Sequence, residues 1–186
     1  MMAQSDLIQR TRTNLTEHRN LGAMFRGESA SAVMLEMCSM RVGQTFYGIP
    51  ITHILEIVGG ARLQPVPLAP EFVAGLVHYR GDVLTTVSLR RLLGAGDFYC
   101  TSARQDIVVL ESPASCFALL VDSVGEVLTV SAADHEPNPS ILDEQRRGLF
   151  AGAYKMKDCL LVMLDPARLD PDRLDYGSLE RGRLRD

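Results

Sequence analysis

Two glutamates in similar apolar surroundings are the first side chains that could do chemistry. Glu56 lies in the stretch ILEIV and Glu126 in the stretch VGEVL, so their carboxylates could serve as a general acid and a general base. No nucleophile or substrate-positioning motif accompanies them, and each could equally pair with a nearby arginine. The sequence also contains no Walker A loop, Rossmann glycine fingerprint, HExxH or GxSxG. A small enzyme that uses Glu56 or Glu126 remains an alternative at this point.

Metal binding would need histidines or cysteines that converge on one point. The histidines fall in different local contexts, and only His53 and His78 could approach each other in space. The four cysteines are widely separated and form no CxxC pair, so we expect free thiols in a reducing cytoplasm, mostly as small buried residues. These cysteines are Cys38, Cys100, Cys116 and Cys159. We expect neither a bound metal nor a cofactor.

An arginine at a turn is a candidate for binding rather than catalysis. The stretch 72–93 reads FVAGLVHYRGDVLTTVSLRRLL, two apolar runs around a polar tip. Gly81 and Asp82 signal a tight turn, and the second run is rich in β-branched residues, as strands are. The turn presents Arg80 beside Tyr79, and both residue types are enriched at interface hot spots. Alternatively, Arg80 forms an ion pair that braces its own turn.

Composition narrows the class of protein. The chain has 186 residues, of which 46% are hydrophobic and 23% charged, values typical of one globular domain or two small ones. A net charge of −4, no tryptophan and 6% aromatic residues disfavour a barrel that binds nucleic acid. No apolar run approaches the ~18 residues that span a bilayer. The N-terminal residues lack the apolar core of a secretory signal.

Short apolar runs between turn signals predict an all-β protein with little helix. Pro50 is expected to split one run into a strand and a second, short strand from about His53. Residues 1–32 are expected to be a flexible or weakly helical extension and residues 176–186 a charged tail, with a short terminal helix at 168–179. The expected strands are 33–42, 45–58 in two parts, 72–77, 83–89, 107–111, 116–121, 124–130, 149–154 and 159–164.

An internal repeat relates the two halves of the chain. Residues 47–57 match 117–127, and residues 75–92 match 152–169, in the same order in both halves. The match makes three pairs equivalent: Ile54 with Val124, Gly75 with Gly152, and Val87 with Leu164. Each half carries about five short strands. We therefore predict two small closed barrels, at approximately 43–95 and 106–165, because closure removes exposed sheet edges.

The same stretches resemble a known family. The segments YGIPITHILEIV, PVPLAPEFVAGLVHYRGDVL, SLRRLLG and FALLVDSVGEVLTV together resemble the CheW-like domain. The resemblance covers about Val33 to Leu169, within an expected domain of residues 33–175. It implies two SH3-like five-stranded β-barrels packed around a shared hydrophobic core, with short helical segments. It also implies a protein without catalytic activity.

The resemblance further implies the partners. A CheW-like adaptor couples transmembrane chemoreceptors to a CheA-type histidine kinase, docking on the regulatory domain of the kinase through barrel-to-barrel contacts. It holds the cytoplasmic tip of the receptor's coiled-coil hairpin in the groove between the barrels. Such an adaptor is cytoplasmic and lies at the inner face of the membrane in receptor arrays, with no direct membrane insertion and no nucleic acid. The matching partner-binding positions are Ile54, Glu56, Gly75, Tyr79, Arg80, Gly81, Val121, Val124 and Glu126.

The sequence departs from the family pattern at two positions. Thr85 and Ser88 stand where the family commonly has proline and aspartate after the Arg-Gly turn. This difference, together with the long N-terminal extension, leaves open a chemotaxis-like pathway that controls another output.

Overall fold

The computed structural model describes residues 33–60, 62–95, 105–113, 115–138, 148–157 and 159–174. The expectations for residues 1–32 and for the charged tail lie outside these ranges. The expected helix at 168–179 is wrong in its described part, because the structure has a short helix at Pro166–Leu169 and no helix at 170–174. The elements are β1 (Met34–Val42), β2 (Thr45–Pro50), η1 (Ile51–His53), β3 (Ile54–Gly59), β4 (Val73–Tyr79), β5 (Asp82–Ser88), α2 (Leu89–Leu92), β6 (Asp106–Glu111), β7 (Cys116–Val121), β8 (Ser123–Ser131), η2 (Ala132–Asp134), β9 (His135–Glu136), β10 (Phe150–Lys155), β11 (Leu160–Leu164) and α4 (Pro166–Leu169).

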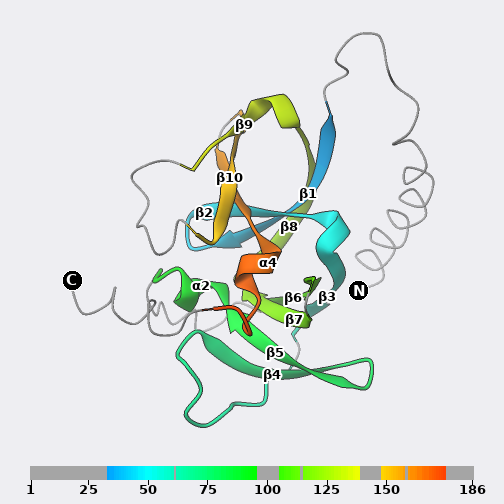
Figure 1. The fold of residues 1–186 in the computed structure, drawn as a ribbon, viewed down its shortest axis with the longest axis vertical. Helices are drawn as coiled ribbons and strands as arrows, with labels where there is room; N and C mark the ends of the chain where they lie inside the picture. The colour runs from blue at the N-terminus through cyan, green and yellow to red at the C-terminus, as the bar shows by residue number, and fades with distance from the viewer. Residues whose placement is uncertain are drawn as a thin grey trace.

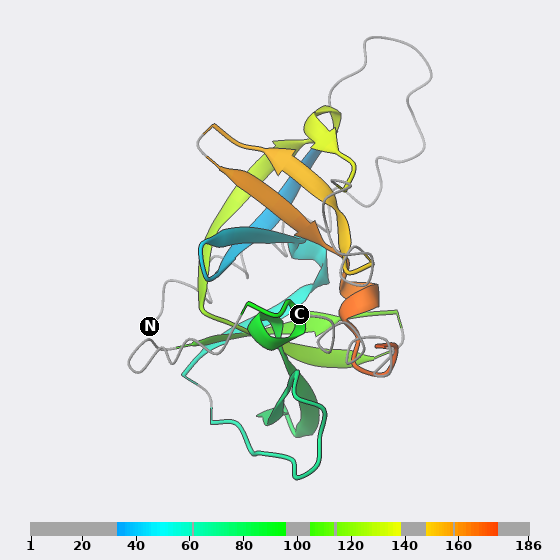
Figure 2. The ribbon, with the colours of Figure 1, turned by 90° about the vertical axis from the view of Figure 1, so that its left-hand side faces the viewer.

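The strands of the described residues form two sheets, one above the other in Figure 1. The lower, first barrel has the order β3-β6-β7-β5-β4, and the upper, second barrel has the order β8-β1-β2-β11-β10-β9. Each sheet curls and is closed by a short segment: Gln64 pairs with Leu76 in the first barrel, and β9 pairs with β10 in the second. Figure 2 shows the two curled sheets from the side. The predicted all-β class is confirmed, with two SH3-like barrels.

Neither barrel is built from one half of the chain. The hairpin β1–β2 lies in the second barrel, between β8 and β11, and the hairpin β6–β7 lies in the first, between β3 and β5. The predicted contiguous barrels at 43–95 and 106–165 are therefore wrong. Apolar spacing reports which face of a strand is buried but not which strand lies beside it, so it could not reveal this exchange.

The strand registers confirm the internal repeat despite the exchange. Ile54 pairs with Leu110 in the first barrel, and its predicted equivalent Val124 pairs with Met40 in the second. The hairpins β4–β5 and β10–β11 agree in the same way. Val73 faces Val87, Phe150 faces Leu164, and each register then shifts immediately before the glycine.

The equivalent glycines have the same structural task. Gly75 has φ +145° and Gly152 φ +132°, a region that side chains with a Cβ rarely adopt. A Cβ on Gly75 would lie 2.6 Å from the carbonyl oxygen of Gln64, and one on Gly152 would lie 2.7 Å from that of Glu136 and against the His135 ring. In both barrels the closing segment therefore passes directly over a bulge glycine.

The core has three layers because the exchanged strands are buried on both faces. Along β6, Val108 and Leu110 point into a central cluster shared by the barrels, whereas Ile107 and Val109 point into the first barrel. In the second barrel, β1 sends Met37 into the barrel interior and Met40 into the shared cluster. This alternation follows from the two-residue period of a strand and confirms the predicted shared core.

We predict that Gly75→Ala and Gly152→Ala destabilise the protein by similar amounts, about 2 kcal/mol or more each, because both place a Cβ against backbone at an unfavourable φ. Urea unfolding would measure the change. Gly59→Ala is the matched control, because a Cβ there would meet only Asp106 Oδ1, at 3.5 Å. A large loss at only one of the two bulges would contradict their equivalence.

Candidate partner-binding site

The tip of the β4–β5 hairpin is a two-residue turn made by Arg80 and Gly81, and β5 begins at Asp82. Both turn residues have positive φ, +52° and +97°, as in the type I′ turns that match the twist of a hairpin. The sequence places the turn at Gly81 and Asp82, which is one residue later than the turn in the structure. Arginine is an uncommon residue at positive φ, so the conformation does not by itself explain why an arginine stands there.

Arg80 is both braced and exposed. Its Nη2 donates to Glu56 Oε2 at 3.0 Å, and its guanidinium lies 5.1 Å from the centre of the Tyr79 ring. The Arg80 side chain is nevertheless 63% exposed and that of Glu56 39% exposed. An exposed ion pair stabilises a fold by only ~0–1 kcal/mol. The two interpretations of Arg80, an intramolecular brace and an interface anchor, therefore coexist at one tip.

The other candidate residues are distributed over the molecule. Ile54 and Val121 are buried in the shared core, and Gly75 is buried under the closing segment. These three residues can therefore influence partner binding only indirectly, through the packing of the barrels. Val124 packs against the shared core from the second barrel, and Glu126 is exposed on β8 of that barrel. The structure therefore gathers Glu56, Tyr79, Arg80 and Gly81 at one place and leaves the rest elsewhere.

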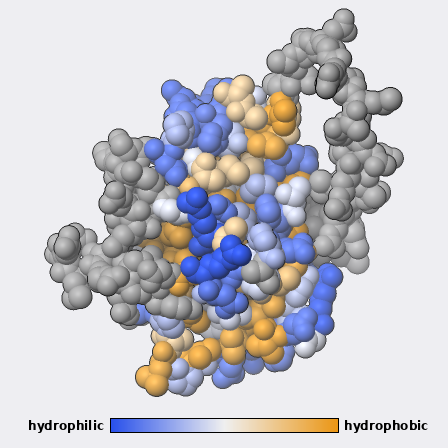
Figure 3. All heavy atoms as spheres, in the orientation of Figure 1, coloured by the Kyte–Doolittle hydropathy of each residue, from blue (hydrophilic) through white to orange (hydrophobic). Residues whose placement is uncertain are grey.

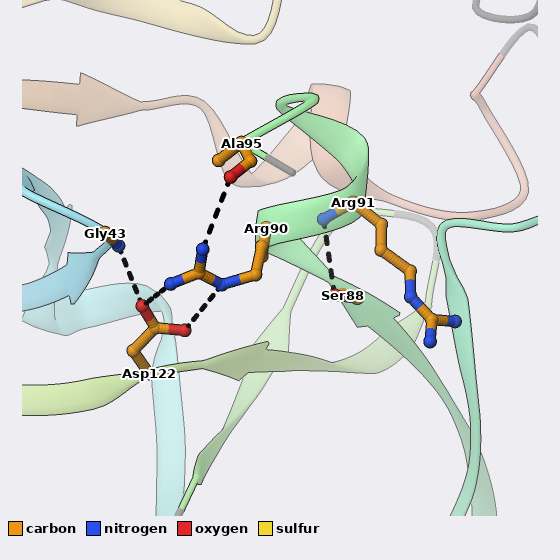
Figure 4. A network of polar contacts seen from close by, with 6 residues as sticks. All are labelled: Gly43, Ser88, Arg90, Arg91, Ala95 and Asp122. Carbon is orange, nitrogen blue, oxygen red and sulfur yellow. Dashed lines mark hydrogen bonds and ion pairs between the residues drawn. The ribbon is translucent and has the colours of Figure 1, made fainter. Parts of the chain in front are cut away.

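Sequence reasoning missed a nearly buried ion pair at the junction of the barrels (Figure 4). Arg90 in α2 donates through Nε to Asp122 Oδ1 at 3.1 Å and through Nη2 to Oδ2. The backbone N–H of Gly43, in the β1–β2 turn, donates to the same Oδ2 at 2.7 Å. The two side chains are 12% and 14% exposed. Because Asp122 lies where the chain passes from β7 of one barrel to β8 of the other, this pair ties the barrels together.

The electrostatics of Asp122 reflect its partners. Burial alone would raise the pKa of its carboxyl, but hydrogen bonds from Arg90 and from the Gly43 N–H, with the positive charges of Arg90 and Arg41, outweigh burial. The net effect is a pKa below the ordinary value for aspartate, so the carboxylate is charged at neutral pH.

A second buried carboxylate holds the C-terminal segment. Asp170 is fully buried, and it accepts from the hydroxyls of Ser112 and Ser115 and from the backbone N–H of Asp172. Burial opposes its ionisation, but these hydrogen bonds and the charge of Arg173 lower the pKa below its ordinary value. The segment after β11 of the second barrel is thereby fastened to the β6–β7 turn of the first.

Ser88, one of the departures from the family pattern, has a local explanation. Its side chain accepts from the backbone N–H of Arg91 at 3.4 Å and caps α2, a task that aspartate performs equally well.

Within the described ranges, no group of three His, Cys, Asp or Glu side chains could hold a metal ion. Of the cysteines, Cys38 is buried and free, with its pKa raised to about 11 by burial, while Cys116 and Cys159 are free but exposed, unlike the expectation of burial. Cys100 lies outside the described residues.

No helix among the described residues has the length and the apolar character needed to cross a membrane.

We predict that Asp122→Asn lowers stability at neutral pH by about 2 kcal/mol, because it leaves the Arg90 charge partly buried without its counter-charge. In the wild type, the stabilisation from a lowered carboxyl pKa is fully present above the unfolded-state value of about 3.9 and is lost as pH falls through the folded-state pKa. The variant should therefore lose less stability on acidification than the wild type.

Urea unfolding at a series of pH values from about 7 to about 3 measures both effects. Asp134→Asn, at an exposed position in η2, is the control and should keep the wild-type pH profile. Parallel profiles for wild type and Asp122→Asn would show that the ion pair does not control acid stability.

Comparison with known proteins agrees with this architecture. A family model described as the CheW-like domain matches residues 36–172. The chain is 31% identical over 130 residues to a "Chemotaxis protein CheW" of Rhizobium meliloti (strain 1021), covering 70% of this chain and 83% of the relative. It is 28% identical over 131 residues to a "Chemotaxis protein CheW" of Helicobacter pylori, covering 70% and 78%.

The fold also matches a solved structure. The scaffolding protein TtCheW from Thermoanaerobacter tengcongensis superposes with a TM-score of 0.68 at 21% identity, over 76% of this chain and 97% of that one. The family model spans most of the sequence, and the paired barrels have the same fold as that structure. The chain therefore belongs to the CheW-like domain family.

Proposed function

We propose that this chain binds both a transmembrane chemoreceptor and a CheA-type histidine kinase and couples one to the other without catalysing a reaction. Its role as a chemotaxis signalling adaptor follows from its family and from relatives that match over most of their length. The regulatory domain of the kinase and the cytoplasmic tip of the receptor are the proposed partners. They would place the adaptor at the cytoplasmic face of the membrane, in receptor arrays.

The observation that supports binding most directly is the exposed arginine tip. Of the Arg80 nitrogens, Nη2 bonds to Glu56, and the guanidinium is stacked beside Tyr79. These contacts favour one orientation of the side chain and leave 63% of it open to solvent. A guanidinium that is already oriented loses less conformational freedom on binding, and it presents a fork of donors to a carboxylate or carbonyl.

The architecture suits an adaptor with two partners. The barrels share one core and are tied by Arg90 and Asp122, so surfaces on the two barrels keep a constant relation. An adaptor with this geometry can hold two partners at a set distance. We place the receptor hairpin in the groove between the barrels and the kinase domain against the Arg80 tip.

A binding experiment with purified proteins tests the function. The full chain is titrated with the CheA-type kinase of its source cell and with a soluble fragment that carries the receptor's helical hairpin. Binding of both, together with a complex of all three, is the expected result. A chain that binds neither protein, or that binds only one of them at a time, would not be a coupling adaptor.

We predict that Arg80→Asn weakens kinase binding by at least ~2 kcal/mol, about thirtyfold in Kd, as expected for a hot-spot arginine. Asparagine tolerates positive φ, so the turn and the melting temperature should be preserved, whereas Arg80→Ala also strains the turn. Isothermal titration and thermal unfolding measure the two properties.

Arg168→Asn is the matched control, because Arg168 is 59% exposed and paired with Asp165 at 3.1 Å. It should bind the kinase as the wild type does. If Arg80→Asn unfolds the protein, the arginine is mainly an intramolecular brace. If the variant binds and melts like the wild type, Arg80 has neither role.

A further inference from the structure

Each barrel is completed by a hairpin from the opposite half of the chain. We define the N-terminal half as residues 33–95 and the C-terminal half as residues 105–174. The first barrel takes β3, β4 and β5 from the N-terminal half and the hairpin β6–β7 from the C-terminal half. The second barrel takes β8 to β11 from the C-terminal half and the hairpin β1–β2 from the N-terminal half. In Figure 2 the blue strands of the β1–β2 hairpin lie beside the orange strands of the β10–β11 hairpin, so the exchange is reciprocal.

Neither half can build a barrel alone. Among the described strands, four ladders join the halves: β1 with β8, β2 with β11, β3 with β6, and β5 with β7. Without these ladders the N-terminal half keeps only the hairpins β1–β2 and β4–β5. An isolated two-stranded hairpin is at best marginally stable in water. Each half therefore needs the other to complete its sheets.

The surface that the halves share is apolar and carries a polar lock. Ile49 and Leu89 of the N-terminal half lie in one cluster with Phe117 of the C-terminal half, and all three are fully buried. Arg90 of the N-terminal half pairs with Asp122 of the C-terminal half. In Figure 3 strongly hydrophilic residues gather at the middle of the molecule, where α4 lies in Figure 1. On this face, polar residues therefore cover the apolar surface between the halves.

One covalent connection joins the halves, because the chain passes from one to the other once, between Ala95 and Gln105. The nine residues 96–104 reach about 30 Å when fully extended, far enough to enter a neighbouring molecule. Exchanging halves with a second copy remakes the same ladders, core and ion pair. The exchanged and single-chain forms therefore differ mainly in the entropy of association. A short link gives an effective concentration on the order of 1 mM, so the single chain is favoured well below that concentration.

We propose that each half of the chain also binds the opposite half of a second copy, giving an exchanged dimer. Each pair of barrels in this dimer combines the N-terminal half of one copy with the C-terminal half of the other. The surface that the second copy fills is one that the structure already shows filled by the same sequence. The junction is shared between the copies, because Arg90 of one meets Asp122 of the other. The dimer carries two complete pairs of barrels and therefore two Arg80 tips.

Isotopically heavy and light copies of the full chain, each with a protease site inserted between Ala95 and Gln105, test the proposal. The copies are unfolded in urea, mixed, refolded together at about 1 mM and then cleaved. The halves should stay associated after cleavage and keep the circular dichroism spectrum of the uncleaved chain. Native mass spectrometry should find heavy N-terminal halves bound to light C-terminal halves. Refolding at about 10 μM should reduce these mixed complexes at least about tenfold.

The control sample mixes heavy and light copies that were refolded and cleaved separately, and it should contain no mixed complexes. Halves that separate and unfold on cleavage would show that they do not hold each other, which overturns the proposal. Halves that stay together but are never mixed after joint refolding would show that a second copy is not bound, which overturns it as well.

Charge reversal tests the geometry of the exchange. Arg90→Asp and Asp122→Arg each place two like charges at the nearly buried junction, which destabilises either variant alone. In an exchanged dimer of the two variants, the introduced charges meet each other and the unaltered residues meet each other. Joint refolding should therefore give a dimer that melts at least about 5 °C above either variant.

The double variant Arg90→Asp/Asp122→Arg is the matched control, because it restores the pair within one chain. It should melt above either single variant without forming more dimer than the wild type. A mixture that melts no higher than its components, while the double variant does, would contradict the exchange. If the reversed pair does not fit the junction, the double variant also fails, and the isotope experiment decides without any substitution.

Discussion

The burial of both faces of the exchanged strands is the constraint on which the rest of the structure depends. Along β6, side chains point alternately into the first barrel and into the cluster between the barrels. A strand that is apolar on both faces cannot lie at the outside of an isolated barrel without exposing one face to water. The two hairpins β1–β2 and β6–β7 therefore lie where the barrels meet, each in the sheet of the opposite half. One core results, and the two halves of the chain cannot be separated without opening it.

Polar side chains then fix how the barrels meet. Arg90 and Asp122 join α2 to the point where the chain crosses from one sheet to the other, and Asp170 fastens the C-terminal segment to the β6–β7 turn. Apolar contacts are not directional, whereas hydrogen-bonded charges have one favourable geometry. The two carboxylates thus select one relative orientation among those that bury a similar apolar area.

The candidate partner-binding surface is the tip of the β4–β5 hairpin. Arg80 stands in the turn of this hairpin with a positive φ, a conformation that is uncommon for arginine. The hairpin is supported by a closed barrel whose bulge glycine, Gly75, lies beneath Gln64.

The sequence by itself determined the strands, the turns and the duplication. Pro50 ended β2 where expected, and the matched spacing around Gly75 and Gly152 identified equivalent bulges, because local sterics and the two-residue period act within a few residues. The family motifs also led to Arg80. Only the tertiary structure decided which strands are neighbours, that Ile54 and Val121 face the core, and that Arg90 meets Asp122, which lies 32 positions away. Those outcomes depend on contacts between segments that are far apart in the sequence. The residues adjacent to a side chain in the sequence do not determine such contacts.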